Sequence, residues 1–233
     1  MKVCLLTNEI YPFLPGGLGR LMYNFCEQNM RAETPIDLHF LMPDSAAEKF
    51  DEMREYFKEK ATLHLCRPLG EYGTKLSAHL ASDKAFHPEF SSNYKLPMQY
   101  YYGLLEAEEH AGAAFDFIEV PDIGGWGHAI LAAKRAGLAF RNSQIVCRLH
   151  SSLGLITQNE PYQHQPSTWF SAMLGLERDV ILGADLVIGH LPAIVEENAA
   201  HYNARKIWRD SVKIETPPIL LDTSAHSSSQ NIP

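Results

Sequence analysis

Three short segments contain residue types that bind or act on ligands, and each one follows a run of apolar residues. The first is a glycine-rich turn at the start of a helix-period segment, made of Gly16, Gly17, Leu18 and Gly19. Glycine lets the backbone come close to a ligand, and a helix N-terminus offers free N–H groups and a positive dipole end. The turn would suit a phosphate group or a sugar oxygen. A tight strand-to-helix turn without a ligand explains the same residues equally well.

The second segment, residues 119–127, contains Asp122 and Trp126. A carboxylate just past a strand end accepts hydrogen bonds from hydroxyl groups, and an indole offers a flat apolar face to a sugar ring. The alternative is that Asp122 caps a turn and Trp126 packs in the core.

The third segment places His150 and Ser151 directly after an apolar run that ends at Leu149. A lone histidine is often a structural residue. Its expected position at a strand end, opposite the glycine turn, favours contact with a ligand instead.

Several common chemistries lack their sequence signatures. A dinucleotide fingerprint that starts at Gly17 would need glycine or alanine where Met22 stands, so NAD binding is disfavoured. No phosphate-binding P-loop, no G-x-S-x-G serine elbow and no metal-binding histidine spacing occur in the sequence. We therefore expect no metal and no tightly bound cofactor.

Short apolar runs that alternate with helix-period segments must position these residues. The expected strands are residues 3–7, 36–42, 63–66, 115–120, 144–149 and 184–188, with a short run at 212–214. This alternation is typical of an α/β fold with a doubly wound, mostly parallel, Rossmann-like sheet of six or seven strands. Such sheets bind ligands at the carboxyl ends of their strands, which is where all three segments are expected.

The connections contribute further expectations. Pro97 suits the first turn of a helix that runs to about residue 114, and residues 67–95 show no sustained period. One domain is expected over residues 1–219. Residues 220–233 have no core-forming pattern and would be a linker or a disordered tail.

Composition narrows the class of protein. The chain has 233 residues, 45% of them hydrophobic, as in ordinary globular proteins. A net charge of −8 opposes attraction to a phosphate backbone, so no nucleic-acid partner is expected. Cation clusters at residues 134–148 and 205–213 are expected to be solvated or paired with carboxylates.

The cysteines and the hydropathy of the sequence indicate the cellular compartment in which the protein is found. The four cysteines do not form a C-x-x-C pair, which indicates a reducing compartment. A signal-peptide core and an apolar run of about 18 residues are both lacking, so a cytoplasmic location without a transmembrane segment is expected.

Taken together, the motifs resemble the amino-terminal half of glycosyltransferase family 4, retaining enzymes with the two-domain GT-B architecture. The resemblance covers about residues 1–219. The matching motifs are Glu9-x-x-Pro12 with the glycine turn, Glu119-x-Pro121-Asp122-x-Gly124-Gly125-x-Gly127, Arg148-Leu149-His150 and Gly183-Ala184-Asp185-Leu186. The second motif is most similar to large bacterial members that build surface polysaccharides.

The resemblance implies a role for each matching position. Gly16, Gly17, Leu18 and Gly19 would bind the donor, with backbone N–H groups toward its diphosphate or its sugar. His150 would be the catalytic histidine near the transferred sugar. Asp122, Trp126 and Ser151 would bind the acceptor, a glycan or a lipid-linked glycan. A nucleotide-sugar would be the donor substrate, and a lipid-linked acceptor would bring the enzyme to the inner face of the membrane.

The sequence departs from the family in one large respect. Family members carry a second domain that binds the nucleotide and has paired glutamates eight positions apart, and no glutamate pair here has that spacing. The carboxyl-terminal donor-binding domain is thus expected to be absent from this chain, which would be inactive alone. The alternative is a catalytically silent carbohydrate-binding or regulatory half that pairs with a separate chain.

Overall fold

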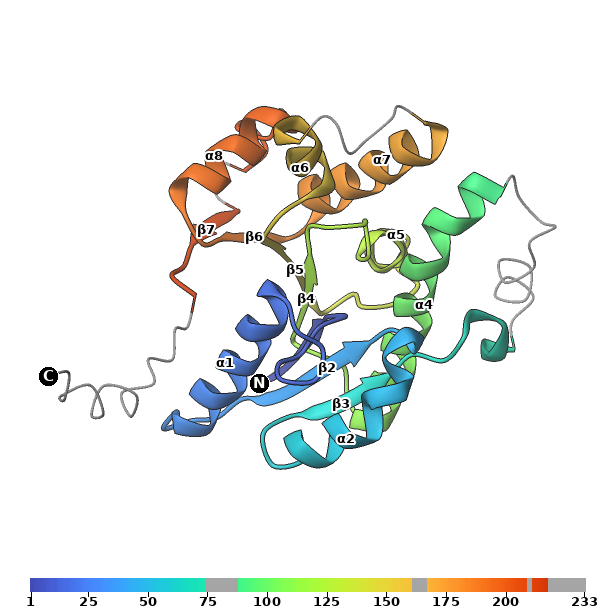
Figure 1. Ribbon diagram of the computed structural model, residues 1–233, viewed down its shortest axis with the longest axis vertical. Coiled ribbons are helices and arrows are strands. Elements are labelled where there is room, and N and C mark those ends of the chain that lie inside the picture. Colours follow the sequence, from blue (N-terminus) through green and yellow to red (C-terminus); the bar gives the residue numbers. More distant parts are fainter. Residues whose placement is uncertain (74–87, 161–166, 209–210, 218–233) are drawn as a thin grey trace, which may run out of the picture.

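A computed structural model describes residues 1–73, 88–160, 167–208 and 211–217, with the backbone alone over residues 88–92. The predicted tail, residues 220–233, lies outside the described residues, as does most of the aperiodic segment before residue 88. Figure 1 shows a sheet in the middle of the molecule with helices on both sides.

The sheet contains seven strands, which confirms the predicted fold class. The strands in the middle of the sheet are short, mostly buried apolar runs, whereas the edge strand at residues 212–214 has no buried residue. The strands are β1 (Lys2–Leu6), β2 (Asp37–Met42), β3 (Thr62–Leu65), β4 (Phe117–Pro121), β5 (Gln144–Leu149), β6 (Leu186–Gly189) and β7 (Val212–Ile214). The strands β4 and β6 begin two residues later than predicted, and Phe115, just before β4, is buried in the core instead.

All strand pairs are parallel, and the order is β3-β2-β1-β4-β5-β6-β7. The strand β1 pairs with both β2 and β4, so that Leu5 lies opposite Phe40 on one side and Glu119 on the other. The chain first builds outward from β1 through β2 and then crosses back to β4. The reversal of strand order between β1 and β4 is the point at which ligands bind in open α/β sheets.

Helices cover both faces of the sheet. The α-helices are α1 (Gly17–Arg31), α2 (Ala47–Phe57), α4 (Pro88–Ala111), α5 (His128–Arg135), α6 (Leu153–Asn159), α7 (Thr168–Gly183) and α8 (Pro192–His201). Two short 3-10 turns, η1 (Asp44–Ala46) and η2 (Leu69–Tyr72), follow β2 and β3.

The core forms two layers. Apolar side chains of α1 and α2 pack with β1–β3 on one face, whereas those of α4, α5, α7 and α8 pack on the other. Both layers hold β1 and β2 rigidly, which fixes the start of α1 relative to the ends of β4 and β5.

Two helices differ from the sequence expectation. Pro97 lies inside α4 and not at its start. A proline interior to a helix removes one hydrogen bond, and here the buried side chains of Tyr100 and Leu104 hold the helix against the core. The helix α6 was not predicted, although the Ser152 hydroxyl caps it by accepting a 3.4 Å hydrogen bond from the Leu155 N–H.

Candidate functional site

The glycine turn and His150 lie face to face at the carboxyl edge of the sheet. An ideal Cβ atom placed on Gly17 would be 3.1 Å from His150 Nε2 and 3.2 Å from Cε1. The turn follows β1, and His150 follows β5, with β4 between the two strands. The residue His150 is exposed to solvent, so its imidazole is not a core group. The two features are therefore neighbours at this edge, as the sequence analysis expected, and their roles in ligand binding remain predictions.

Asp122 has a different position from the one expected of an acceptor-binding residue. Its side chain is 1% exposed. Oδ2 accepts a 3.0 Å hydrogen bond from the His150 N–H, and Oδ1 accepts one of 3.2 Å from the Ser151 N–H. This is the capping role that the sequence left as an alternative. Asp122 holds the backbone of His150 and Ser151 in place from beneath.

Burial dominates the electrostatics of Asp122. Removal from water raises the pKa of this carboxyl group to about 7, against the opposing effect of the two backbone donors. The group that supports the His150 loop therefore titrates near neutral pH.

Trp126 also lies in the core, which corrects its expected role as an acceptor platform. Its side chain is 6% exposed and stacks on Tyr100, with ring centroids 5.2 Å apart and an interplanar angle of 28°. Gly124 and Gly125, which precede it, have left-handed φ angles of 69° and 64°. This turn packs the indole inward, so its face does not meet a sugar. Ser151 lies at the edge beside His150 and is half-buried.

The three glycines of the turn have different neighbours. A Cβ atom on Gly16 would lie 1.9 Å from Glu9 Oε2, and one on Gly19 would lie 2.8 Å from the Leu14 carbonyl oxygen. The Gly19 N–H donates a 3.1 Å hydrogen bond to Glu9 Oε2. Gly16 and Gly19 are thus explained by close packing of residues 9–14 on the helix start. Leu18 is buried among the side chains of α1 and α2, so of its groups only the backbone is suited to bind a donor.

Glu177 of α7 is a buried carboxylate beside the candidate site that the sequence analysis did not single out. Its side chain is fully buried, and its carboxylate accepts hydrogen bonds from the N–H groups of Gly124 (2.8 Å), Leu153 (3.0 Å) and Gly154 (3.2 Å). Burial raises its pKa. The same carboxylate joins the turn after β4 to the turn after β5, which are two of the three walls of the site. The sequence did contain a signal for it. Glu177 lies four residues from both Met173 and Ile181, so it is a charged residue on the apolar face of this helix.

Three of the four basic residues in the first cation cluster have carboxylate partners, and the fourth, Arg141, is exposed and donates to the Gly137 carbonyl oxygen. Arg148 lies beneath the site and forms a buried bidentate pair with Glu119, with distances of 2.5 and 2.7 Å. Lys134 pairs with Asp185, and Arg135 with Asp179 at 2.9 Å. These cations are neutralised within the fold.

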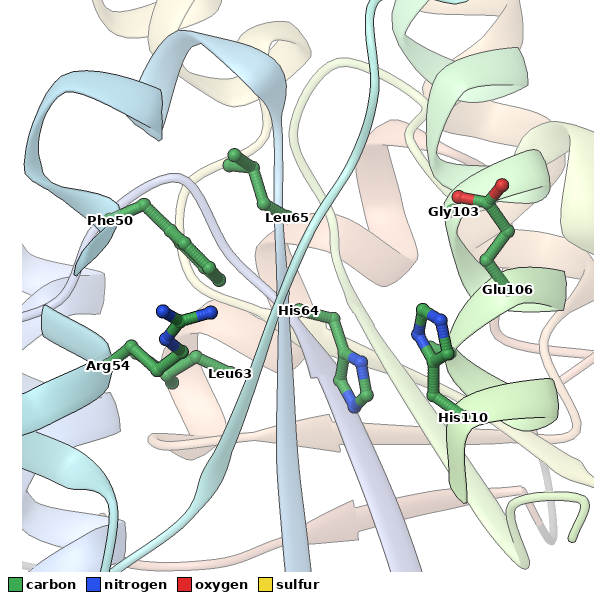
Figure 2. Close-up of a pocket in the computed structure, with 9 residues that line it drawn as sticks. Phe50, Arg54, Leu63, His64, Leu65, Gly103, Glu106 and His110 are labelled. Carbon is green, nitrogen blue, oxygen red and sulfur yellow. The ribbon is translucent and has the colours of Figure 1, made fainter. Parts of the chain in front are cut away.

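A second hollow lies away from this edge. It has a volume of about 250 Å³ and lies beside β3, between α2 and α4. Figure 2 shows His64 and His110 facing each other there, with Arg54 and Phe50 on the other side of β3. Burial, with His39 and His110 nearby, lowers the pKa of His64 to about 4. None of the predicted site residues lines this hollow.

The described part of the chain has neither a metal-binding cluster nor a membrane-spanning helix. No group of three or more His, Cys, Asp or Glu side chains there has an arrangement that could hold a metal ion. No helix there is both long enough and apolar enough to cross a lipid bilayer.

Comparison with known proteins gives structural matches only. No protein-family model matches the sequence, and no curated protein matches it. A UDP-glucose:anthocyanidin 3-O-glucosyltransferase, solved with UDP, matches with a TM-score of 0.53 at 12% identity. A UDP-glucosyltransferase from Polygonum tinctorium that is capable of glucosylating indoxyl, solved in complex with 3,4-dichloroaniline, matches with a TM-score of 0.53 at 11% identity.

The matches cover most of this chain but little more than half of each enzyme. They include 95% and 99% of this chain and 55% and 54% of the two solved chains. At such low identity the likeness establishes the fold and not the activity. The chain has the Rossmann-like α/β fold of one half of a GT-B glycosyltransferase.

Proposed function

We propose that this chain is the acceptor-side half of a glycosyltransferase that moves a sugar from a nucleotide-sugar to a glycan or lipid-linked acceptor. The observation that carries the proposal is the exposed His150 imidazole, 3.1 Å from the Cβ position of Gly17, at the edge where the strand order reverses. A bare backbone turn beside an exposed imidazole offers N–H groups and a ring nitrogen to a ligand that lies along their common outer edge.

We assign each residue a role from its position in the site. An imidazole takes or donates a proton near neutral pH, so His150 would hydrogen-bond the reacting hydroxyl groups of the acceptor or the sugar. Asp122 and Glu177 would act as positioning residues, because both bind backbone N–H groups of the surrounding turns. A second half would supply most of the groups that stabilise the departing diphosphate.

We propose further that the chain belongs to glycosyltransferase family 4, acts with a retaining mechanism and takes part in surface polysaccharide synthesis. This finer proposal rests on the sequence motifs, since the two matched structures support a nucleotide-sugar glycosyltransferase only in general. A cytoplasmic enzyme at the inner face of the membrane would fit a lipid-linked acceptor.

A transfer assay tests the proposal. The full natural gene product is incubated with a panel of UDP-sugars and glycan acceptors, and products are detected by mass spectrometry. We expect sugar transfer that falls at least roughly a hundredfold in His150→Ala, the scale of a lost acid–base group. The matched control is His110→Ala, an exposed histidine of the second hollow, which keeps full activity. Equal losses in both variants would contradict the assigned role of His150.

The second candidate is a silent carbohydrate-binding half, which the Glu9 carboxylate at the helix start favours because it leaves less room for a diphosphate. Titration of the full gene product with uridine diphosphate separates the two. The enzyme binds the nucleotide, and the silent half does not.

A further inference from the structure

Two buried histidines join the edge strand β3 to its neighbour β2, on the side of the sheet that faces α4. His39 Nδ1 lies 2.9 Å from His64 Nε2, and the ring planes differ by 14°. The two residues are only 4% and 9% exposed. In the described sheet β3 is the last strand on its side, next to β2. The histidine pair therefore adds a side-chain bond to the single backbone ladder that holds this strand.

This bond limits how many protons the pair can carry. A hydrogen bond between two imidazole nitrogens needs one donor and one acceptor, so it forms when both rings are neutral or when one is charged. With both rings charged, two N–H groups would face each other across the 2.9 Å contact. Two buried charges of the same sign would also repel more strongly than they do in water. The pair tolerates one added proton but not two.

The neighbours of the pair oppose a charge on His64 in particular. Asp37 Oδ1 lies 3.0 Å from His39 Nε2 and would compensate a charge on that ring. On its other side His64 faces His110 of α4, with parallel rings whose centroids are 6.3 Å apart (Figure 2). A proton on either neighbouring imidazole makes a charge on His64 more costly. The other ionisable groups around the pair are Lys2 of β1, Arg54 of α2, Glu106 and Glu108 of α4, and Asp116 before β4.

We infer that the His39–His64 pair is an acid-sensitive latch, which holds the edge strand β3 on β2 near neutral pH and releases it as the solution becomes acidic. Release lets His64 take up a proton in water, which the folded contact opposes. It would leave the edge of β2 unpaired and would open the hollow between α2 and α4. The latch does not depend on sugar transfer, so the failure of one proposal leaves the other intact.

The pKa values of the two rings agree with this geometry. Burial, together with His39 and His110 nearby, lowers the pKa of His64 from 6.5 to about 4. Burial also lowers the pKa of His39, against the effect of Asp37. A histidine whose pKa is lowered by folding stabilises the fold above about pH 6.5, and this contribution is lost as the pH falls towards 4. From His64 alone, the equilibrium constant for release of β3 should be roughly twentyfold larger at pH 5 than at pH 7.

Hydrogen exchange of the full chain, measured at pH 7 and pH 5, tests the latch. The Cys66 amide reports the release of β3, because its N–H donates a 2.8 Å hydrogen bond to the Met42 carbonyl oxygen at the end of the strand pair. The reference is the Asp185 amide, which donates a 2.9 Å bond to the Ile145 carbonyl oxygen in the other half of the sheet. Protection factors are compared, since they correct for the intrinsic pH dependence of exchange.

Three variants separate the latch from other effects of acid. His64→Gln removes the titrating ring and keeps an amide that can bond to His39. The double variant His39→Phe/His64→Phe replaces both polar partners with apolar rings, so it remains informative if His64→Gln folds poorly. The matched control is His201→Gln, which removes an exposed histidine of α8 outside this face.

We expect the protection factor of Cys66 to fall roughly twentyfold from pH 7 to pH 5 in the natural chain and in His201→Gln. In His64→Gln and in the double variant it should fall less than about threefold, and Asp185 should change little in any chain. Equal falls in the natural chain and in both variants of the pair would overturn the inference. So would an unchanged Cys66 amide in the natural chain, or an equal fall at Asp185, which would indicate general unfolding by acid.

Discussion

At the scale of single residues, the glycine turn shows that one motif can have several causes. Gly16 makes room for the Glu9 carboxylate, Gly19 for the backbone at Leu14, and Gly17 for His150. The sequence identified the turn and its helix, and it placed His150 correctly. It did not distinguish among the glycines, because only the packed structure shows which neighbour would meet a side chain at each position.

The first prediction concerns Gly16→Ala. The φ angle of Gly16 is 170°, an extended conformation that any residue adopts, so the cost comes from displacing the Glu9 carboxylate. Loss of its bond to the Gly19 N–H should lower the free energy of unfolding by about 1.5 kcal/mol, the net value of a hydrogen bond to a charged group. Urea denaturation measures this value in two backgrounds. In Glu9→Ala, the same change at Gly16 should cost less than about 0.5 kcal/mol, and an equal cost in both would refute the contact.

The second prediction concerns Gly17→Val. Its branched side chain would collide with the His150 ring, because a single Cβ atom is already 3.1 Å from Nε2. Ligand binding at this edge should be lost, whereas the free energy of unfolding should change by less than about 2 kcal/mol, since the His150 side chain is exposed to solvent. The NMR signals of the His150 ring, recorded for the natural chain and for Gly17→Val, check both the contact and the fold.

The third prediction is a pH dependence from Asp122. Its pKa is about 7 in the folded chain and about 4 in an unfolded one, so folding favours the protonated group. Its stabilising effect is complete below about pH 4 and is lost as the pH rises through 7.

Denaturant unfolding at pH 5 and pH 8 measures this effect against Asp122→Asn, which does not titrate. The free energy of unfolding of the natural chain, minus that of Asp122→Asn, should be smaller at pH 8 than at pH 5 by more than about 1 kcal/mol. Asp51→Asn, an exposed site, serves as the control and should show no such change. Parallel stability profiles for the natural chain and Asp122→Asn would show that this pKa is not raised.

At the scale of elements, Glu177 connects parts that are distant in the sequence. One buried carboxylate on α7 binds N–H groups of the turn after β4 and of the first residues of α6. Sequence periodicity predicted the strands well, since each is a short apolar run. It missed α6 and the true start of α4, because those helices depend on a cap and on tertiary packing rather than on their own pattern.

The fourth prediction follows from this connection. Glu177→Gln replaces one acceptor oxygen with an amide N–H that faces backbone donors, so the free energy of unfolding should fall by about 2–3 kcal/mol. Hydrogen exchange should accelerate at Gly124, Leu153 and Gly154, while the strand amides of β1 stay protected. Glu196→Gln, whose partner Arg205 lies on the surface, is the control and should change neither quantity. Unchanged exchange at Gly124 and Leu153 would mean that Glu177 does not hold the turns.

At the scale of the whole molecule, the parallel sheet brings three segments to one edge. The order of strands puts the ends of β1, β4 and β5 side by side, and this is why residues 17, 122 and 150 meet. Topology rules were enough to predict this meeting. They were not enough to decide which side chains face solvent. The sequence left both a ligand-facing and an interior position open for Asp122 and Trp126, and both side chains lie in the interior.

The molecule as described also spans little more than half of the enzymes that share its fold. The exposed His150 imidazole lies at the open edge of the sheet, and the reaction proposed above would need a second surface to hold the nucleotide. This is the physical reason to expect weak ligand affinity from the chain alone.

The most direct test of the account is the mapping of UDP-glucose binding onto the ¹⁵N-labelled chain by NMR. The account predicts that the largest shifts fall on Gly17, His150 and Ser151, and that they disappear in Gly17→Val. Shifts centred instead on Arg54, His64 and His110 in the hollow beside β3, with the glycine turn unaffected, would contradict it.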